Sequence, residues 1–67
     1  MTVDDAEERL ARLVHDVRTP LTIVLGFSDM LRRRGEDLEP EQRAEFVQRL
    51  DEAARDIQRL LDEARPT

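Results

Sequence analysis

The hydrophobic residues of this 67-residue chain recur at spacings of three and four, and polar residues fill the positions between them. Such spacing aligns apolar side chains along one side of an α-helix, which completes a turn about every 3.6 residues. Two series of this kind predict two amphipathic helices. The first comprises Val3, Ala6, Leu10, Leu13, Val14, Val17, Leu21, Val24, Leu25 and Leu31, and the second comprises Phe46, Val47, Leu50, Ala53, Ala54, Ile57, Leu60, Leu61 and Ala64.

Residues at both ends of the first series mark the bounds of its helix. Thr2 is suited to cap the helix, because its hydroxyl can accept a hydrogen bond from an unpaired N–H of the first turn. Three arginines, residues 32–34, complement the negative end of the helix dipole. Gly35 is expected to end the helix in a left-handed conformation, which a residue without a side chain adopts readily. The first helix is therefore predicted over about residues 3–34.

A short connection over about residues 35–39 leads into the second series. Pro40 is expected to open the second helix, because the missing N–H of proline costs nothing at the first helical position. The apolar pattern extends this helix over about residues 40–65. Pro66 is expected to end or kink it, since proline inside a helix removes a hydrogen bond and clashes with the preceding turn.

Two helices joined by so short a connection are expected to run antiparallel, within a single all-α domain over residues 1–67. One such hairpin leaves much of its apolar surface uncovered. Two copies would cover that surface by pairing into a symmetric four-helix bundle, so the sequence predicts a homodimer. The residues expected in the dimer core are Leu10, Val17, Val24, Leu50, Ile57 and Leu61.

Composition argues against several classes of function. The chain has 16 acidic and 11 basic residues, and a net charge of −5 disfavours binding to nucleic acid. It has no cysteine and one histidine, so no disulfide, metal site or bound cofactor is expected. The longest apolar run, residues 23–27, is too short to insert into a membrane, and no basic-then-apolar leader opens the chain. A cytoplasmic location is expected.

The single histidine, His15, falls on the polar side of the first helix. At roughly 100° per residue, it lies about 150° from the centre of the apolar stripe. A histidine packed in a core would lie on the stripe, so His15 is expected to face solvent while the helix holds its backbone rigid. Thr19, one turn further on, projects within about 40° of His15 by the same geometry.

The neighbours of His15 suit it to phosphoryl transfer. An imidazole is largely uncharged near neutral pH and can attack phosphorus through one ring nitrogen. Asp16 can accept a hydrogen bond from the other ring nitrogen, which fixes the tautomer and stabilises the positive charge that develops. Thr19 could hold a water for hydrolysis of a phosphorylated receiver. Pro20 lacks an N–H, which frees the carbonyl of Asp16 and favours a local bend.

Residues 15–22, which read HDVRTPLT, resemble the H-box of sensor histidine kinases. Residues 10–14 before the box and residues 26–31 after it are also similar to the dimerisation and histidine-phosphotransfer domains of that family, and so is the second helix. Two positions depart from the family pattern. Val14 stands where serine is common, and Asp16 stands where glutamate is commoner. Neither departure removes a chemical group that the family uses.

The resemblance implies a role for each residue of the site. In that family the H-box histidine takes the γ-phosphoryl group of ATP, the next acidic residue is the general base, and the threonine four residues on assists phosphatase activity. These roles fall on His15, Asp16 and Thr19. The implied partners are a second copy of the chain, a kinase ATP-binding domain that uses Mg-ATP, and a response-regulator receiver domain whose aspartate takes the phosphoryl group. Nothing in this chain resembles the ATP-binding domain, so no kinase activity is expected of the chain alone.

Other interpretations remain open. A purely structural helical hairpin or coiled-coil dimer would explain both apolar stripes without any chemistry. A stand-alone phosphorelay carrier would share the exposed histidine, but such carriers typically form a four-helix bundle within one longer chain.

Two further groups of residues have two interpretations each. Ile23 and Phe27 lie outside the main stripe, near the face of His15. They either dock the receiver domain, as the resemblance implies, or belong to the core, because the core is wide or because a bend at Pro20 rotates them inward. The arginines at 32–34 either bind phosphate or an acidic partner, or are solvated charges at the end of a helix.

Overall fold

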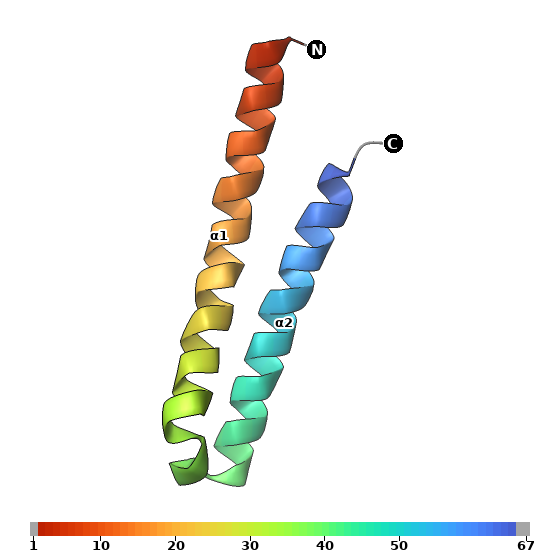
Figure 1. The fold of residues 1–67 in the computed structure, drawn as a ribbon. Coiled ribbons are helices and arrows are strands. Elements are labelled where there is room, and N and C mark those ends of the chain that lie inside the picture. Colours follow the sequence, from red (N-terminus) through yellow and green to blue (C-terminus); the bar gives the residue numbers. More distant parts are fainter. Residues whose placement is uncertain (1, 66–67) are drawn as a thin grey trace.

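The computed structural model describes residues 2–65, which form two long helices packed as an antiparallel hairpin (Figure 1). Helix α1 spans Val3–Arg34 and helix α2 spans Pro40–Ala64. A single 3-10 turn, η1, covers Gly35–Asp37 between them. The part of the chain that the structure describes contains no strand, and the predicted all-α hairpin is confirmed. Pro66, which was expected to end the second helix, lies outside the described residues.

Helix α1 begins with a reciprocal pair of hydrogen bonds between Thr2 and Asp5. The backbone N–H of Asp5 donates to Oγ1 of Thr2 at 3.2 Å, and the backbone N–H of Thr2 donates to a carboxylate oxygen of Asp5 at 3.3 Å. This capping box satisfies two donors that would otherwise lack a partner. The expected cap at Thr2 is therefore confirmed, and such caps contribute about 1 kcal/mol to helix stability.

The other end of α1 differs from the sequence prediction. Gly35 has φ −57° and ψ −36°, which is right-handed, so the expected left-handed stop is wrong. The chain instead tightens into η1. The guanidinium of Arg43, from the first turns of α2, donates to the carbonyl of Gly35 from Nε at 3.2 Å and from Nη2 at 2.6 Å. A side chain from the second helix thus satisfies a carbonyl at the end of the first. In many helices a left-handed glycine allows backbone N–H groups to satisfy such carbonyls.

Helix α2 begins at Pro40, as its sequence predicted. The preceding residue, Glu39, is extended, and its backbone N–H donates to the side-chain oxygen of Gln42 at 3.1 Å. The backbone N–H of Arg43 then donates to the carbonyl of Glu39 at 2.9 Å, the first bond of the helical ladder. Together these bonds hold the turn that brings α2 back alongside α1.

Apolar side chains of both helices meet in a line that we call the hairpin seam. Its residues recur at alternating spacings of four and three, the repeat by which packed helices interlock. Pro20 and Ala53 are buried there, and the rings of Phe27 and Phe46 pack edge to face with centroids 5.1 Å apart. The seam comprises Leu13, Val17, Pro20, Val24, Phe27 and Leu31 from α1 and Phe46, Leu50, Ala53, Ile57 and Leu60 from α2, all buried or half-buried.

A second apolar set remains uncovered on a single hairpin, and we call it the open apolar face. A groove on this face runs along α1 and is closed on one side by Leu61 of α2. Four of the six residues expected in a dimer core belong to the hairpin seam, and the other two, Leu10 and Leu61, lie on the open apolar face. The face comprises Leu10, Val14, Leu21 and Leu25 from α1 and Val47 and Leu61 from α2, with Leu25 as much as 61% exposed.

Neither helix within residues 2–65 has an apolar stretch of the length that a bilayer crossing requires. The outer side of α2 instead carries ion pairs one turn apart. Arg55 contacts Asp51 at 2.9 Å, and Arg59 contacts both Asp56 and Glu63 at 3.3 and 3.2 Å. These exposed pairs support the helix weakly, and α2 is held mainly by the hairpin seam.

Candidate functional site

His15 lies near the middle of α1, on the side that faces away from α2. Its side chain is 84% exposed, which confirms the expected solvent-facing position. Leu13 and Val17 lie on either side of it in the sequence and belong to the hairpin seam. The packing of these two residues fixes the helix backbone, so the imidazole projects outward from a rigid support.

Asp16 contacts the imidazole at a defined atom. The distance between Nδ1 of His15 and Oδ1 of Asp16 is 3.3 Å. A carboxylate at Nδ1 favours the tautomer in which Nδ1 carries the proton and donates it to the carboxylate. Nε2 then holds a lone pair, on a side chain that is 84% exposed. The site therefore presents a nucleophilic nitrogen together with a group that can receive the proton from the opposite side of the ring.

Thr19 is exposed one turn after His15. Within the described residues its hydroxyl has no hydrogen-bond partner, whereas the hydroxyl of Thr22 donates to the carbonyl of Arg18 at 3.0 Å. The two threonines therefore differ in what their hydroxyls can do. Thr22 is engaged by the helix backbone, and Thr19 is available to orient a water molecule near His15.

Pro20 follows directly and is buried in the hairpin seam. Helix α1 runs through it as one uninterrupted element, although proline cannot donate to the carbonyl of Asp16 one turn earlier. The sequence analysis left Pro20 out of the apolar stripe. Its ring in fact lies in the hairpin seam, on the side of α1 that faces α2. The exposed site lies at the same height along α1, on the other side of the helix.

Ile23 and Phe27 occupy different environments. The side chain of Ile23 lies at the surface and Ile23 is 42% exposed. Phe27 is half-buried, and its ring packs against Phe46 across the hairpin seam. The structure thus places Ile23 on the surface near Thr19 and gives Phe27 a packing role between the helices.

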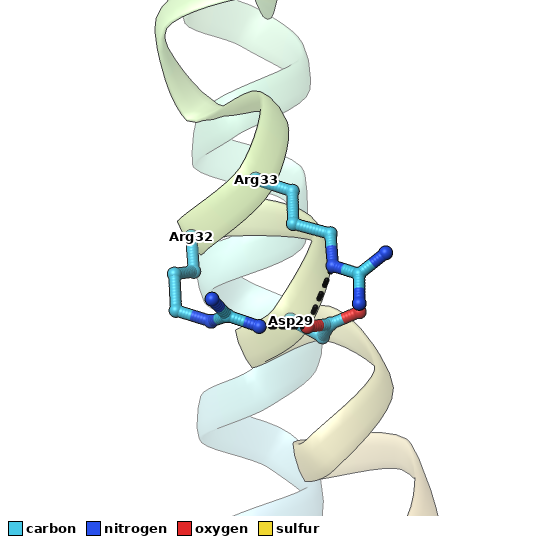
Figure 2. Close-up of polar contacts among 3 residues, drawn as sticks. All are labelled: Asp29, Arg32 and Arg33. Atoms are coloured by element: carbon cyan, nitrogen blue, oxygen red, sulfur yellow. Dashed lines mark hydrogen bonds and ion pairs between the residues drawn. The ribbon is translucent and has the colours of Figure 1, made fainter.

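The three arginines at the end of α1 are partly neutralised by Asp29. One carboxylate oxygen of Asp29 accepts from Nη2 of Arg32 at 2.7 Å and from Nε of Arg33 at 3.1 Å (Figure 2). The hydrogen bond from Arg32, with the positive charges of both arginines, lowers the pKa of Asp29 below its ordinary value. Two of the three guanidiniums are therefore engaged within α1, which favours a role at the helix end.

Two arginines to which the sequence analysis gave no role flank the site. Arg12 precedes His15 by three residues and Arg18 follows it by three, and both are exposed. The signal that could have found them is this spacing, which puts residues on one side of a helix. Among residues 2–65, no group of three or more histidine and carboxylate side chains could hold a metal ion.

Comparison with known proteins bears on the whole hairpin. The family model described as the His Kinase A (phospho-acceptor) domain matches residues 5–65. This span contains the site and nearly all of both helices. Comparison with curated proteins and with solved structures gives no match.

Proposed function

Because this chain belongs to the His Kinase A (phospho-acceptor) domain family, we propose that it is the homodimeric phosphoacceptor domain of a two-component sensor histidine kinase. The observation that carries the proposal is the state of His15. Its side chain is 84% exposed and its Nδ1 contacts Asp16, so Nε2 is left as an accessible nucleophile. We place the domain in the cytoplasm, where ATP and response regulators are found.

In the proposed reaction the lone pair on Nε2 attacks the γ-phosphorus of ATP. The new N–P bond forms as the bond to the bridging oxygen breaks, and ADP leaves. The imidazole becomes positively charged, and Asp16 stabilises this charge and accepts the proton from Nδ1. Mg-ATP is the substrate of a separate kinase ATP-binding domain, which would present the γ-phosphate in line with Nε2.

The phosphoryl group then passes to an aspartate of a receiver domain. A carboxylate oxygen of that aspartate attacks the phosphorus, and the N–P bond breaks to return the imidazole to its neutral state. Ile23, exposed two turns beyond His15, offers the receiver an apolar contact, and the exposed edge of Phe27 extends it. This docking role explains an apolar side chain on the polar side of α1.

Thr19 is proposed to serve the opposite reaction. Its free hydroxyl can hold a water in line with the phosphorus of a phosphorylated receiver, and attack by this water returns inorganic phosphate. The threonine side chain does not itself take the phosphoryl group. The same face of α1 would thus support both phosphotransfer and dephosphorylation.

The homodimer is proposed from the open apolar face. Val14 and Leu21 on α1 lie seven residues apart, and Val47 and Leu61 on α2 lie at positions related by the same repeat. A repeat of seven residues keeps one line of side chains facing a partner along a whole helix. A second copy brings an identical line of apolar residues, so two hairpins would complete a four-helix bundle.

The test is transfer of phosphate from Mg-ATP to the chain by a separately supplied catalytic domain of the same class. Phosphate bound to histidine is lost in acid and stable in base, which distinguishes it from phosphate on serine or threonine. A purely structural hairpin would acquire no label at His15.

A further inference from the structure

Arg12 and Arg18 stand at equal distances on either side of His15 along α1. At roughly 100° per residue, each projects about 60° to one side of the imidazole, in opposite directions. Residues three apart on a helix have Cβ atoms about 5–6 Å from one another, and an arginine side chain spans that distance easily. Arg12 and Arg18 therefore flank His15 on the surface of α1, and each guanidinium can reach its imidazole.

Both guanidiniums lack a carboxylate partner within the described residues. On other parts of the two helices, by contrast, Arg32, Arg33 and Arg55 are each held by an aspartate at 2.7 to 3.1 Å. Asp16 lies four residues after Arg12, a spacing that permits an ion pair. Its carboxylate contacts His15 instead, which leaves Arg12 without a counter-ion.

Charge around His15 also differs from charge on the chain as a whole. The chain has a net charge of −5, yet Asp16 is the only acidic residue between Glu8 and Asp29. The same stretch contains three arginines, Arg9, Arg12 and Arg18. Arg12 and Arg18 lie on either side of the imidazole along α1, and Asp16 contacts Nδ1. Glu63 of α2 lines a groove with Arg12 and Asp16, and its carboxylate is paired with Arg59. An anion that approached the imidazole would meet a locally positive surface.

We propose that Arg12, together with Arg18, forms a clamp that binds the phosphoryl group carried on Nε2 of His15. This inference rests on the proposed phosphoacceptor function and assigns that site two phosphoryl-binding residues. A phosphoryl group on nitrogen carries nearly two negative charges, and guanidinium binds such groups through paired, charge-assisted hydrogen bonds. Asp16 occupies the opposite ring nitrogen, so it does not compete with the clamp.

The clamp makes a specific electrostatic prediction. Positive charge beside the phosphoryl group favours its dianion, so it lowers the pKa of the monoanion-to-dianion step. One guanidinium about 6 Å away in water changes that pKa by about half a unit, and the change falls as salt screens the charges. Replacing Arg12 by a neutral side chain should therefore raise the pKa.

The experiment needs no kinase. The chain is treated with phosphoramidate, whose phosphorus is attacked by Nε2 with release of ammonia, and the product is followed by phosphorus NMR as pH is varied. Arg12→Gln removes the charge, and Arg12→Lys retains it. Arg34→Gln is the matched control, because it removes one exposed arginine of α1 nineteen residues from His15, about 28 Å along the helix.

Arg12→Gln is expected to raise the pKa of the phosphoryl group by about half a unit relative to Arg34→Gln, and Arg12→Lys should restore most of the difference. Equal values in Arg12→Gln and Arg34→Gln would overturn the clamp while leaving the phosphoacceptor function intact. Failure of wild-type His15 to accept phosphate from phosphoramidate, with the hairpin folded, would overturn both.

Discussion

Asp16 and His15 are adjacent in the sequence, and their side chains meet at Nδ1, 3.3 Å from the carboxylate. Adjacent residues of a helix normally diverge by about 100°. This contact forms because the imidazole turns its Nδ1 edge toward Asp16 and its Nε2 edge toward solvent. One short carboxylate side chain therefore sets the orientation of the ring. It also determines which ring nitrogen, Nε2, can act as the nucleophile.

The first prediction concerns that carboxylate. Asp16→Asn keeps the shape of the side chain but cannot accept a proton, so phosphorylation of His15 should slow by about 100-fold, the lower end of the range for general acid–base catalysis. Initial rates of acid-labile labelling measure the effect. Asp37→Asn, which changes an exposed aspartate of η1 at the hairpin turn, is the control. If both variants react at the wild-type rate, Asp16 has no part in the mechanism.

Thr19 and Thr22 provide a matched pair for the dephosphorylation step. Thr19→Ala should leave phosphorylation of His15 unchanged and reduce dephosphorylation of the receiver by about tenfold or more, because a water loses its orienting hydroxyl. Thr22→Ala should alter neither, since that hydroxyl donates to the carbonyl of Arg18. Receiver dephosphorylation measured with the full kinase decides the matter. Equal phosphatase rates in both variants would remove Thr19 from this role.

Ile23 and Phe27 should respond differently to truncation. Phe27→Ala removes a ring that packs against Phe46, so it should destabilise the hairpin by about 2 kcal/mol, less than a fully buried phenylalanine would. Ile23→Ala should change the melting temperature little and slow transfer to a limiting concentration of receiver. Melting curves paired with a binding titration test both. A loss of stability in Ile23→Ala with normal receiver binding would end the docking role of Ile23.

The open apolar face is tested by two glutamate substitutions at exposed residues of α1. Leu25→Glu places a charge where a second copy would pack, and it should weaken the dimer by about 100-fold or more, since a buried unpaired charge is costly. Ile23→Glu places the same charge on the side of His15 and should leave the dimer intact. Sedimentation equilibrium at micromolar concentration gives the mass. A compact helical monomer in the wild-type chain would rule out the four-helix bundle.

The two helices could be predicted from the sequence because their signals are local. Thr2 and Pro40 act through the backbone groups of their own first turns, and the apolar spacing is a property of one helix at a time. The exposed position of His15 follows from the same geometry. The end of α1 could not be predicted in this way, because the group that satisfies the Gly35 carbonyl is Arg43, a residue of the other helix.

The division of the apolar residues into two sets was also beyond the sequence pattern. A helical projection shows one broad stripe, whereas α1 packs against α2 with only part of it. Val17 and Val24 belong to the hairpin seam, and Leu21 and Leu25 belong to the open apolar face. The position of α2 decides this division, and it is set by packing between the helices.

The most direct test of the phosphoacceptor function is labelling of His15 itself. The chain is incubated with a catalytic domain of this kinase class and Mg-ATP that carries a radiolabelled γ-phosphate, and the product is treated with acid or base. Wild-type chain should acquire up to one acid-labile, base-stable phosphate per chain. His15→Gln should acquire none while its helicity stays at the wild-type level, because the side chain faces solvent. Acid-labile label that persists in His15→Gln would contradict the account.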